Sequence, residues 1–230
     1  MTGSRNQAGL VEAIRSGDLA VLARLLEAQP GLASARIQGR RNSSRTPLHV
    51  ATDWPGHFPN GAAVVRILIA AGADVNARTT GRADTETPLH GAASSEAVGV
   101  AEAVIADGAD LEAAGGSIGT PLDNAVGYGC WQVARLLVER GARVEKLWHA
   151  SALGLMSAVE RLISGGMPEE INAAFWQACH GAQPRAAAYL LAHGADPAFV
   201  PSYSNKSALQ IASSLETRRE TLVSWLRERA

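Results

Sequence analysis

A small set of acidic and imidazole side chains could carry out acid–base chemistry in this sequence. The candidates are Asp53, His57, Asp123 and His149. Carboxylates and imidazoles are the side chains that most often move a proton in catalysis. Trp54 and Phe58 lie in the same segment as the first two candidates, so this chemistry would take place beside an aromatic cleft. The sequence has no P-loop, no His-Glu-x-x-His pair and no Cys-x-x-Cys pair, so we expect no metal and no cofactor, and an enzyme is only an alternative reading.

These candidates are distributed over a repeated phrase. Thr-Pro-Leu-His occurs at 46–49 and 87–90, and Thr-Pro-Leu-Asp at 120–123; a Gly-Ala pair follows each copy, at 72–73, 108–109 and 141–142. The step from Thr87 to Thr120 is 33 residues, and the chain resembles ankyrin-repeat proteins in both period and phrase. The resemblance implies an all-α solenoid of helix-turn-helix units with β-like hairpin fingers. It also implies a protein that binds other proteins or peptides.

Local physical chemistry explains why the phrase begins and ends helices. The threonine can cap a helix, and proline fits the first helical position because the N–H there has no partner. Glycine at the end of the second helix tolerates the left-handed backbone of a C-cap, and we expect this of Gly72, Gly108, Gly141, Gly166 and Gly194. Alanines at one repeat position allow close approach of neighbouring helices, namely Ala51, Ala92, Ala125, Ala150, Ala178 and Ala212.

The repeats predict one elongated domain over residues 1–230, with about seven helix pairs. Residues 1–45 form an N-terminal capping unit, 46–197 hold five central repeats, and 198–230 form a C-terminal capping unit. The last two central repeats, opening near Glu145 and Ala173, are degenerate. Gly141 and Gly166 are only 25 residues apart, so we expect shortened or missing fingers there.

The first full repeat carries an insertion at 53–61. Thr46 to Gly72 spans 26 residues, whereas Thr87 to Gly108 spans 21. Insertions in solenoids map to loops, often on the binding face, and the two prolines in this one limit its freedom. The segment resembles a Trp-Pro-Gly-His-Phe-Pro-Asn-Gly insertion in uncharacterised bacterial ankyrin proteins, which brings no known activity. We expect Asp53, Trp54, His57 and Phe58 to form one wall of the principal binding site.

A row of polar residues accompanies the insertion. His90, Asp123 and His149 lie on the expected inner helices, and Ser95 and Tyr128 near the ends of two of them. Buried polar groups are costly unless they are paired. The row is therefore either an internal hydrogen-bond ladder or a polar pocket, and the sequence leaves both readings open.

Composition excludes some classes of partner. Lysine and arginine number 21 against 22 acidic residues, without a run of like charge, which argues against a nucleic-acid partner. No apolar run is long enough for a membrane span, and residues 1–7 lack a signal-peptide core. Cys130 and Cys179 lie in different repeats, so we expect free thiols and a cytoplasmic protein.

Two functions follow from these features. The first is a binding module that recognises a protein or peptide with its concave face and the 53–61 insertion. The second is a small-molecule binding protein or acid–base enzyme in which the insertion is a lid over an aromatic and polar groove. An enclosed cavity of a few hundred Å³ under the loop would favour the second function. An open surface beside the loop would favour the first.

Overall fold

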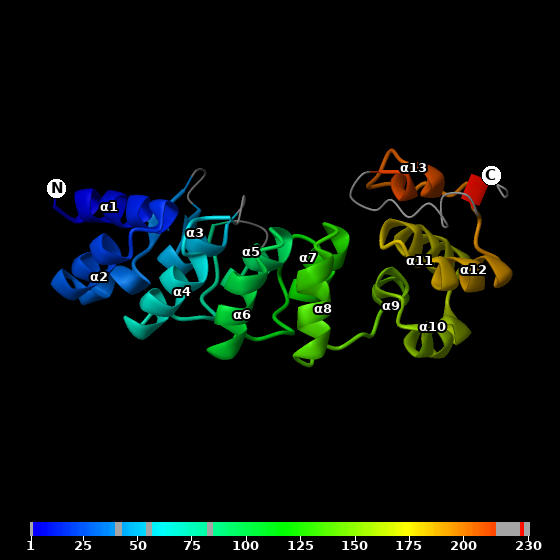
Figure 1. Cartoon of the computed structure of the whole chain (residues 1–230), viewed down its shortest axis with the longest axis horizontal. Helices are drawn as coiled ribbons and strands as arrows, with labels where there is room; N and C mark the ends of the chain where they lie inside the picture. Colours follow the sequence, from blue (N-terminus) through cyan, green and yellow to red (C-terminus); the bar gives the residue numbers. More distant parts are fainter. Residues whose placement is uncertain (1, 40–42, 54–56, 82–84, 215–225, 228–230) are drawn as a thin grey trace. The chain divides into compact units, whose positions relative to one another are not determined.

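The computed structural model describes residues 2–39, 43–53, 57–81, 85–214 and 226–227. The described chain is mostly helical, and its helices are stacked in antiparallel pairs (Figure 1). Residue contacts divide the chain into two compact units, Met1–Ala142 and Arg143–Ala230, called here unit 1 and unit 2. Within the described residues, no helix is both long and apolar enough to cross a membrane.

The described residues of unit 1 form four helix pairs. Its helices are α1 (Thr2–Ser16), α2 (Leu19–Ala28), α3 (Pro47–Thr52), α4 (Gly61–Ala70), α5 (Pro88–Ser94), α6 (Val98–Ala106), α7 (Pro121–Gly127) and α8 (Trp131–Glu139). The first helices of the pairs, α1, α3, α5 and α7, pack in one row, and the second helices, α2, α4, α6 and α8, form another (Figure 1). A short 3-10 helix, η1 (Pro30–Ser34), follows α2.

The Thr-Pro phrases of unit 1 begin helices where expected, although the threonine hydroxyl accepts a backbone N–H only at Thr120, among these three. Thr46, Thr87 and Thr120 each have an extended backbone at the N-cap, and proline follows at the first helical position. The helix stops also agree, because Gly72, Gly108 and Gly141 adopt φ values of 92°, 87° and 103°. A residue with a Cβ is strained in that left-handed region.

The fingers of unit 1 contain little regular sheet. Strands β1 (Ile37–Gln38) and β2 (Ser44–Arg45) pair antiparallel in the first finger. Ser44 also bridges to Thr80 in the next finger. These contacts link neighbouring repeats on the finger side, as the β-like hairpins of the repeat predict.

Unit 2 is built on the same plan, with short connections before α9 and α11. Its helices are α9 (Leu147–Leu153), α10 (Met156–Leu162), η2 (Ile163–Gly165, a 3-10 turn), α11 (Pro168–His180), α12 (Pro184–Ala192) and α13 (Ala208–Ala212). Four residues connect Ala142 to α9, and two connect η2 to α11, so neither connection has room for a full finger. The partner helix expected for α13 falls largely on residues outside the described set.

The start of α11 differs from the sequence-based expectation. The helix begins at Pro168 instead of near Ala173, because proline occupies its first position and the Glu170 carboxylate accepts a hydrogen bond from the Met167 N–H at 3.0 Å. Gly166 does not adopt the expected left-handed backbone either. Its φ is −71°, because the preceding helix pair ends in the 3-10 turn η2. Residues 168–172, which were expected before the helix, therefore belong to α11.

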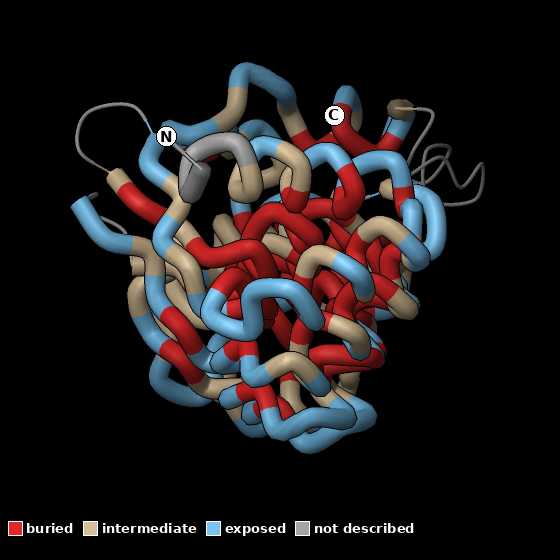
Figure 2. Tube along the Cα trace, turned by 90° about the vertical axis from the view of Figure 1, so that its left-hand side faces the viewer, coloured by how far each residue is buried: buried red, intermediate tan, exposed pale blue. Residues whose placement is uncertain are grey.

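Small residues let the helices pack closely in both units. The six alanines at the shared repeat position are all buried, and buried segments alternate with exposed turns along the trace (Figure 2). Phe175 and Trp176 enlarge the core of unit 2. Cys130 and Cys179 are buried free thiols, as expected, and burial raises their pKa values to about 11 and about 12. High thiol pKa values make both cysteines poor nucleophiles.

Candidate functional site

The C-terminal ends of three consecutive inner helices form one edge of unit 1. Asp53, Ser95 and Tyr128 are the C-cap residues of α3, α5 and α7, and these helices pack side by side. The stack therefore brings three predicted site residues to equivalent places in neighbouring repeats. We call this surface, with the adjoining residues 57–60 and 117–118, the helix-end edge.

The insertion enters the helix-end edge through Asp53. The Asp53 carboxylate pairs with the Arg45 guanidinium, which ties the start of the insertion to strand β2. His57 is exposed and Phe58 is half-buried. Asn60 donates a hydrogen bond from Nδ2 to the Gly17 carbonyl at 3.0 Å, which holds the far end of the insertion on the preceding repeat. Trp54 lies outside the described residues.

Tyr128 belongs to an exposed apolar patch that sequence reasoning identified only in part. The residue is 54% exposed, and its hydroxyl lies 3.1 Å from the Ser117 hydroxyl. Ile118, in the same finger, is 44% exposed and lies against Gly127 so closely that a Cβ there would come within 2.4 Å of its Cδ1 atom. The finger therefore folds over the end of α7. In the sequence, the position of Ile118 between two glycines of the finger was the signal for an exposed apolar residue.

The glycines of this finger have a structural explanation. Residues 115–119 read Gly-Gly-Ser-Ile-Gly, which has the letters of the Gly-x-Ser-x-Gly nucleophile elbow. An elbow needs a strand before the serine, whereas the Gly116 N–H donates to the Gly119 carbonyl at 2.8 Å in a tight turn, with no described strand leading into it. The Ser117 hydroxyl is hydrogen-bonded to Tyr128, and His90, beside Gly116, is bonded to Thr87 and Gly119, so this turn does not form a nucleophile site.

The histidines of the two Thr-Pro-Leu-His phrases, His49 and His90, are buried and contact backbone carbonyls of the next repeat. In His90, Nδ1 accepts the Thr87 N–H at 3.1 Å and Nε2 contacts the Gly119 carbonyl at 3.0 Å. His49 repeats the pattern with the Thr46 N–H and the Glu86 carbonyl. Accepting at one ring nitrogen and donating at the other requires the neutral ring. Burial lowers the pKa of His49 to about 4, and it lowers the pKa of His90 as well.

Asp123 replaces the histidine of the third phrase and keeps only part of its role. Its Oδ2 accepts the Thr120 N–H at 2.7 Å and the Thr120 hydroxyl at 3.0 Å. A carboxylate cannot donate to a carbonyl, so Asp123 caps its own helix without reproducing the second histidine bond. The next residue, Asn124, donates to the Ser94 hydroxyl at 3.1 Å and accepts the Ile118 N–H at 3.2 Å. Along α5 and α7 the polar row is therefore a hydrogen-bond ladder.

Ser95 and His149 complete the predicted set. Ser95 is buried, and its hydroxyl donates to the Gly91 carbonyl within its own helix at 2.9 Å. His149 belongs to unit 2, where it is buried on α9 with its ring edge-on to Trp148 at 4.2 Å between centroids. Of the nine predicted residues, unit 1 thus presents Asp53, His57, Phe58 and Tyr128 at the surface and buries His90, Ser95 and Asp123.

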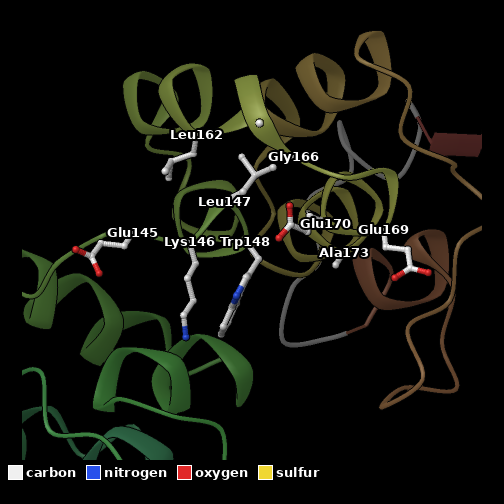
Figure 3. Close-up of a pocket in the computed structure, with 10 residues that line it drawn as sticks. Glu145, Lys146, Leu147, Trp148, Leu162, Gly166, Glu169, Glu170 and Ala173 are labelled. Atoms are coloured by element: carbon white, nitrogen blue, oxygen red, sulfur yellow. The ribbon is translucent and has the colours of Figure 1, made fainter.

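Unit 2 contains an open hollow where its two fingers are missing (Figure 3). Its volume is about 640 Å³, and Leu147, Trp148, Leu162 and Ala173 supply apolar walls between α9, α10 and the start of α11. Lys146 lies beside the Trp148 ring, with Nζ 5.7 Å from the ring centroid. The shortened fingers were the sequence signal for this uncovered stretch. In the described residues, no cluster of three or more His, Cys, Asp or Glu side chains could hold a metal ion.

Two comparisons with known proteins agree with this geometry. A family model described as ankyrin repeats (three copies) matches residues 58–146. The crystal structure of the human ASB11 ankyrin repeat domain is similar in fold, with a TM-score of 0.56 over 96% of this chain and 97% of that chain. The two sequences are 19% identical, which supports a shared fold and nothing finer.

Proposed function

We propose that this chain, an ankyrin-repeat protein whose repeats are matched over residues 58–146, binds a protein or peptide partner through unit 1. Ankyrin repeats are in general protein-binding modules. The contact surface in this proposal is the helix-end edge, with the 53–61 insertion beside it. The cytoplasmic location, the bacterial source and the single-domain organisation over 1–230 stay predictions from the sequence.

The observation that carries the proposal is the division of polar and aromatic groups between surface and interior. His90 and Asp123 form hydrogen bonds inside the stack, whereas Tyr128, Ile118 and His57 are exposed to solvent. Exposed aromatic side chains with few rotatable bonds are the groups that most often dominate the binding energy of an interface. The buried ladder keeps the repeats in register, so the exposed groups are held in place before a partner arrives.

The proposal is tested by capture from a lysate of the source cells. The full chain, the double variant His57→Ala/Tyr128→Ala and a control variant at an exposed residue of unit 2, His193→Ala, are immobilised at equal density. We expect one set of proteins to bind the full chain and the control and to be lost from the double variant. The melting temperature of the double variant should stay within about 2 °C of the parent, because exposed substitutions cost little.

Two results would contradict the proposal. Equal capture by the parent and the double variant would place the partner elsewhere. A metabolite that raises the melting temperature while no protein is captured would favour the small-molecule alternative. That alternative has less support, because the described acid–base candidates do not converge: Asp53 is paired with Arg45 and Asp123 caps α7.

A further inference from the structure

The hollow of unit 2 is a consequence of two consecutive missing fingers. α9 follows Ala142 after only four residues, and α11 follows η2 after only two. In unit 1 the corresponding space is taken up by residues such as 114–119, which fold over α7. The starts of α9 and α11 are therefore uncovered, and the apolar side chains of Leu147, Trp148 and Leu162 face an open space. Met167, beside this hollow, is 63% exposed.

The charges around the hollow favour a cation. Its lining contains three carboxylates, from Glu145, Glu169 and Glu170, and one ammonium, from Lys146. In Figure 3 the Glu170 carboxylate turns toward Leu147 and Trp148, whereas Glu145 and Glu169 point away from the Trp148 ring. Glu145 pairs with Arg143 at 3.3 Å. Glu170 is therefore the carboxylate that a ligand on the Trp148 ring would meet.

The neighbouring cations are already engaged. Arg143 pairs with Glu145, and Arg161 donates to the Val144 carbonyl at 3.2 Å. Lys146 is the cation beside the Trp148 ring, and cations are attracted to the face of an indole. The chain thus places its own ammonium where a cation from a partner would be favoured.

An anionic ligand is disfavoured at the same place. The N-terminus of α11 would attract an anion, but Glu169 and Glu170 occupy its first turn, and Glu170 already accepts the Met167 N–H. A phosphate would meet these carboxylates at close range. Among the described residues, no second bond is formed by Oε1 of Glu170, so this oxygen is available to accept one from a guanidinium.

We propose that the hollow is a docking site for a basic protein segment in which an arginine stands next to a leucine-sized apolar residue. The apolar side chain lies against Leu147 and Leu162. The guanidinium lies between the Trp148 ring and the Glu170 carboxylate and displaces Lys146. This site is separate from the helix-end edge, and it gives unit 2 a recognition role of its own.

The test uses the full chain and fluorescein-labelled synthetic peptides. One peptide alternates arginine and leucine in a glycine–serine background; in its counterparts glutamate replaces arginine, or serine replaces leucine. Anisotropy titrations at low salt compare the parent with Lys146→Ala and Glu170→Gln. Glutamine can still accept the Met167 N–H, so the second variant removes the charge and keeps the helix cap. Glu160→Gln on α10 and Lys206→Ala, outside the hollow, are the controls.

We expect the arginine–leucine peptide to bind and both counterparts to bind more weakly. Because Lys146 competes for the same ring, Lys146→Ala should tighten binding, and Glu170→Gln should weaken it, each by roughly two- to fivefold for a partly exposed ion contact. The controls should change nothing. Opposite signs from two substitutions in one hollow are not produced by a general loss of folding.

The proposal is overturned if the glutamate peptide binds as well as the arginine peptide, or if neither variant changes the affinity. It is also overturned if sedimentation shows a dimer that Trp148→Ala dissociates, because a second copy would then cover the hollow. These outcomes leave the helix-end edge untested, since His57→Ala/Tyr128→Ala alters no residue of the hollow. Failure of one site is therefore distinguishable from failure of the other.

Discussion

The inner helices of the two units carry different side chains at the repeat position that faces the next repeat. In unit 1, buried histidines at 49 and 90 bond the backbone of the next finger. In unit 2 the same repeat position holds Trp148 and Trp176, and no described strand or finger precedes α9 or α11. Each histidine bonds the carbonyl of the residue before the next N-cap. Trp148 has no finger before α11 to bond in this way. Trp176 has one before α13, and its Nε1 donates to the Lys206 carbonyl at 2.9 Å, directly before the N-cap Ser207.

This difference separates the two kinds of surface. Unit 1 uses hydrogen bonds to fix its fingers and then exposes Tyr128 and Ile118 upon them. Unit 2 uses apolar volume and leaves a hollow where the fingers would be. The comparison predicts that unit 1 is sensitive to changes in polar groups, whereas unit 2 is sensitive to changes in volume.

The largest effect should come from removing the indole of Trp176. The side chain is almost fully buried in the core of unit 2, so Trp176→Ala should lower the free energy of unfolding by about 3–5 kcal/mol. Urea unfolding followed by circular dichroism measures the change, with exposed His193→Ala as the control. A loss below about 1 kcal/mol would mean that apolar volume does not hold unit 2 together.

A smaller effect is expected from removing one rung of the ladder. His90→Ala deprives the Thr87 N–H and the Gly119 carbonyl of their partner, and a buried unsatisfied group costs roughly 1–3 kcal/mol. We expect a loss of about 3 kcal/mol in all. Amide hydrogen exchange should show the loss in residues 85–128 and not beyond 143. Uniform loss of protection in both units would contradict the comparison.

The third effect is the dependence of stability on pH. Because the pKa of His49 falls from 6.5 to about 4 on folding, the unfolded chain binds more protons between these values. Stability is therefore fully present above pH 6.5 and declines as the pH falls toward 4, by roughly 2 kcal/mol for this group between pH 7 and 5. Urea midpoints at the two pH values measure it. His49→Asn should reduce the pH dependence and His193→Asn should not; equal slopes for both variants would contradict it.

Much of the fold could be predicted from the sequence because the repeat is encoded in local signals. The Thr-Pro starts, the left-handed glycines and the buried alanines were all expected. Each of these signals affects residues only a few positions away in the sequence. The missing fingers also followed from simple spacing. The start of α11 at Pro168 did not, because the cap formed by Met167, Pro168 and Glu170 is not part of the repeated Thr-Pro-Leu phrase.

The candidate site was less predictable. Which residue of a polar row is buried depends on contacts between repeats, such as the bond from Asn124 to Ser94, and no local pattern shows these. Tyr128 was expected on this side of the stack, whereas the exposure of Ile118 depends on how its finger folds over Gly127. The role of the insertion stays a prediction.

The central claim is that the helix-end edge of unit 1 contacts a protein partner. Hydrogen–deuterium exchange of the full chain, alone and saturated with the captured partner, tests it most directly. The account predicts slower exchange in peptides that cover 53–61 and 114–130, with little change over helix α4. Slower exchange confined to other segments, with 53–61 and 114–130 unchanged, would contradict it.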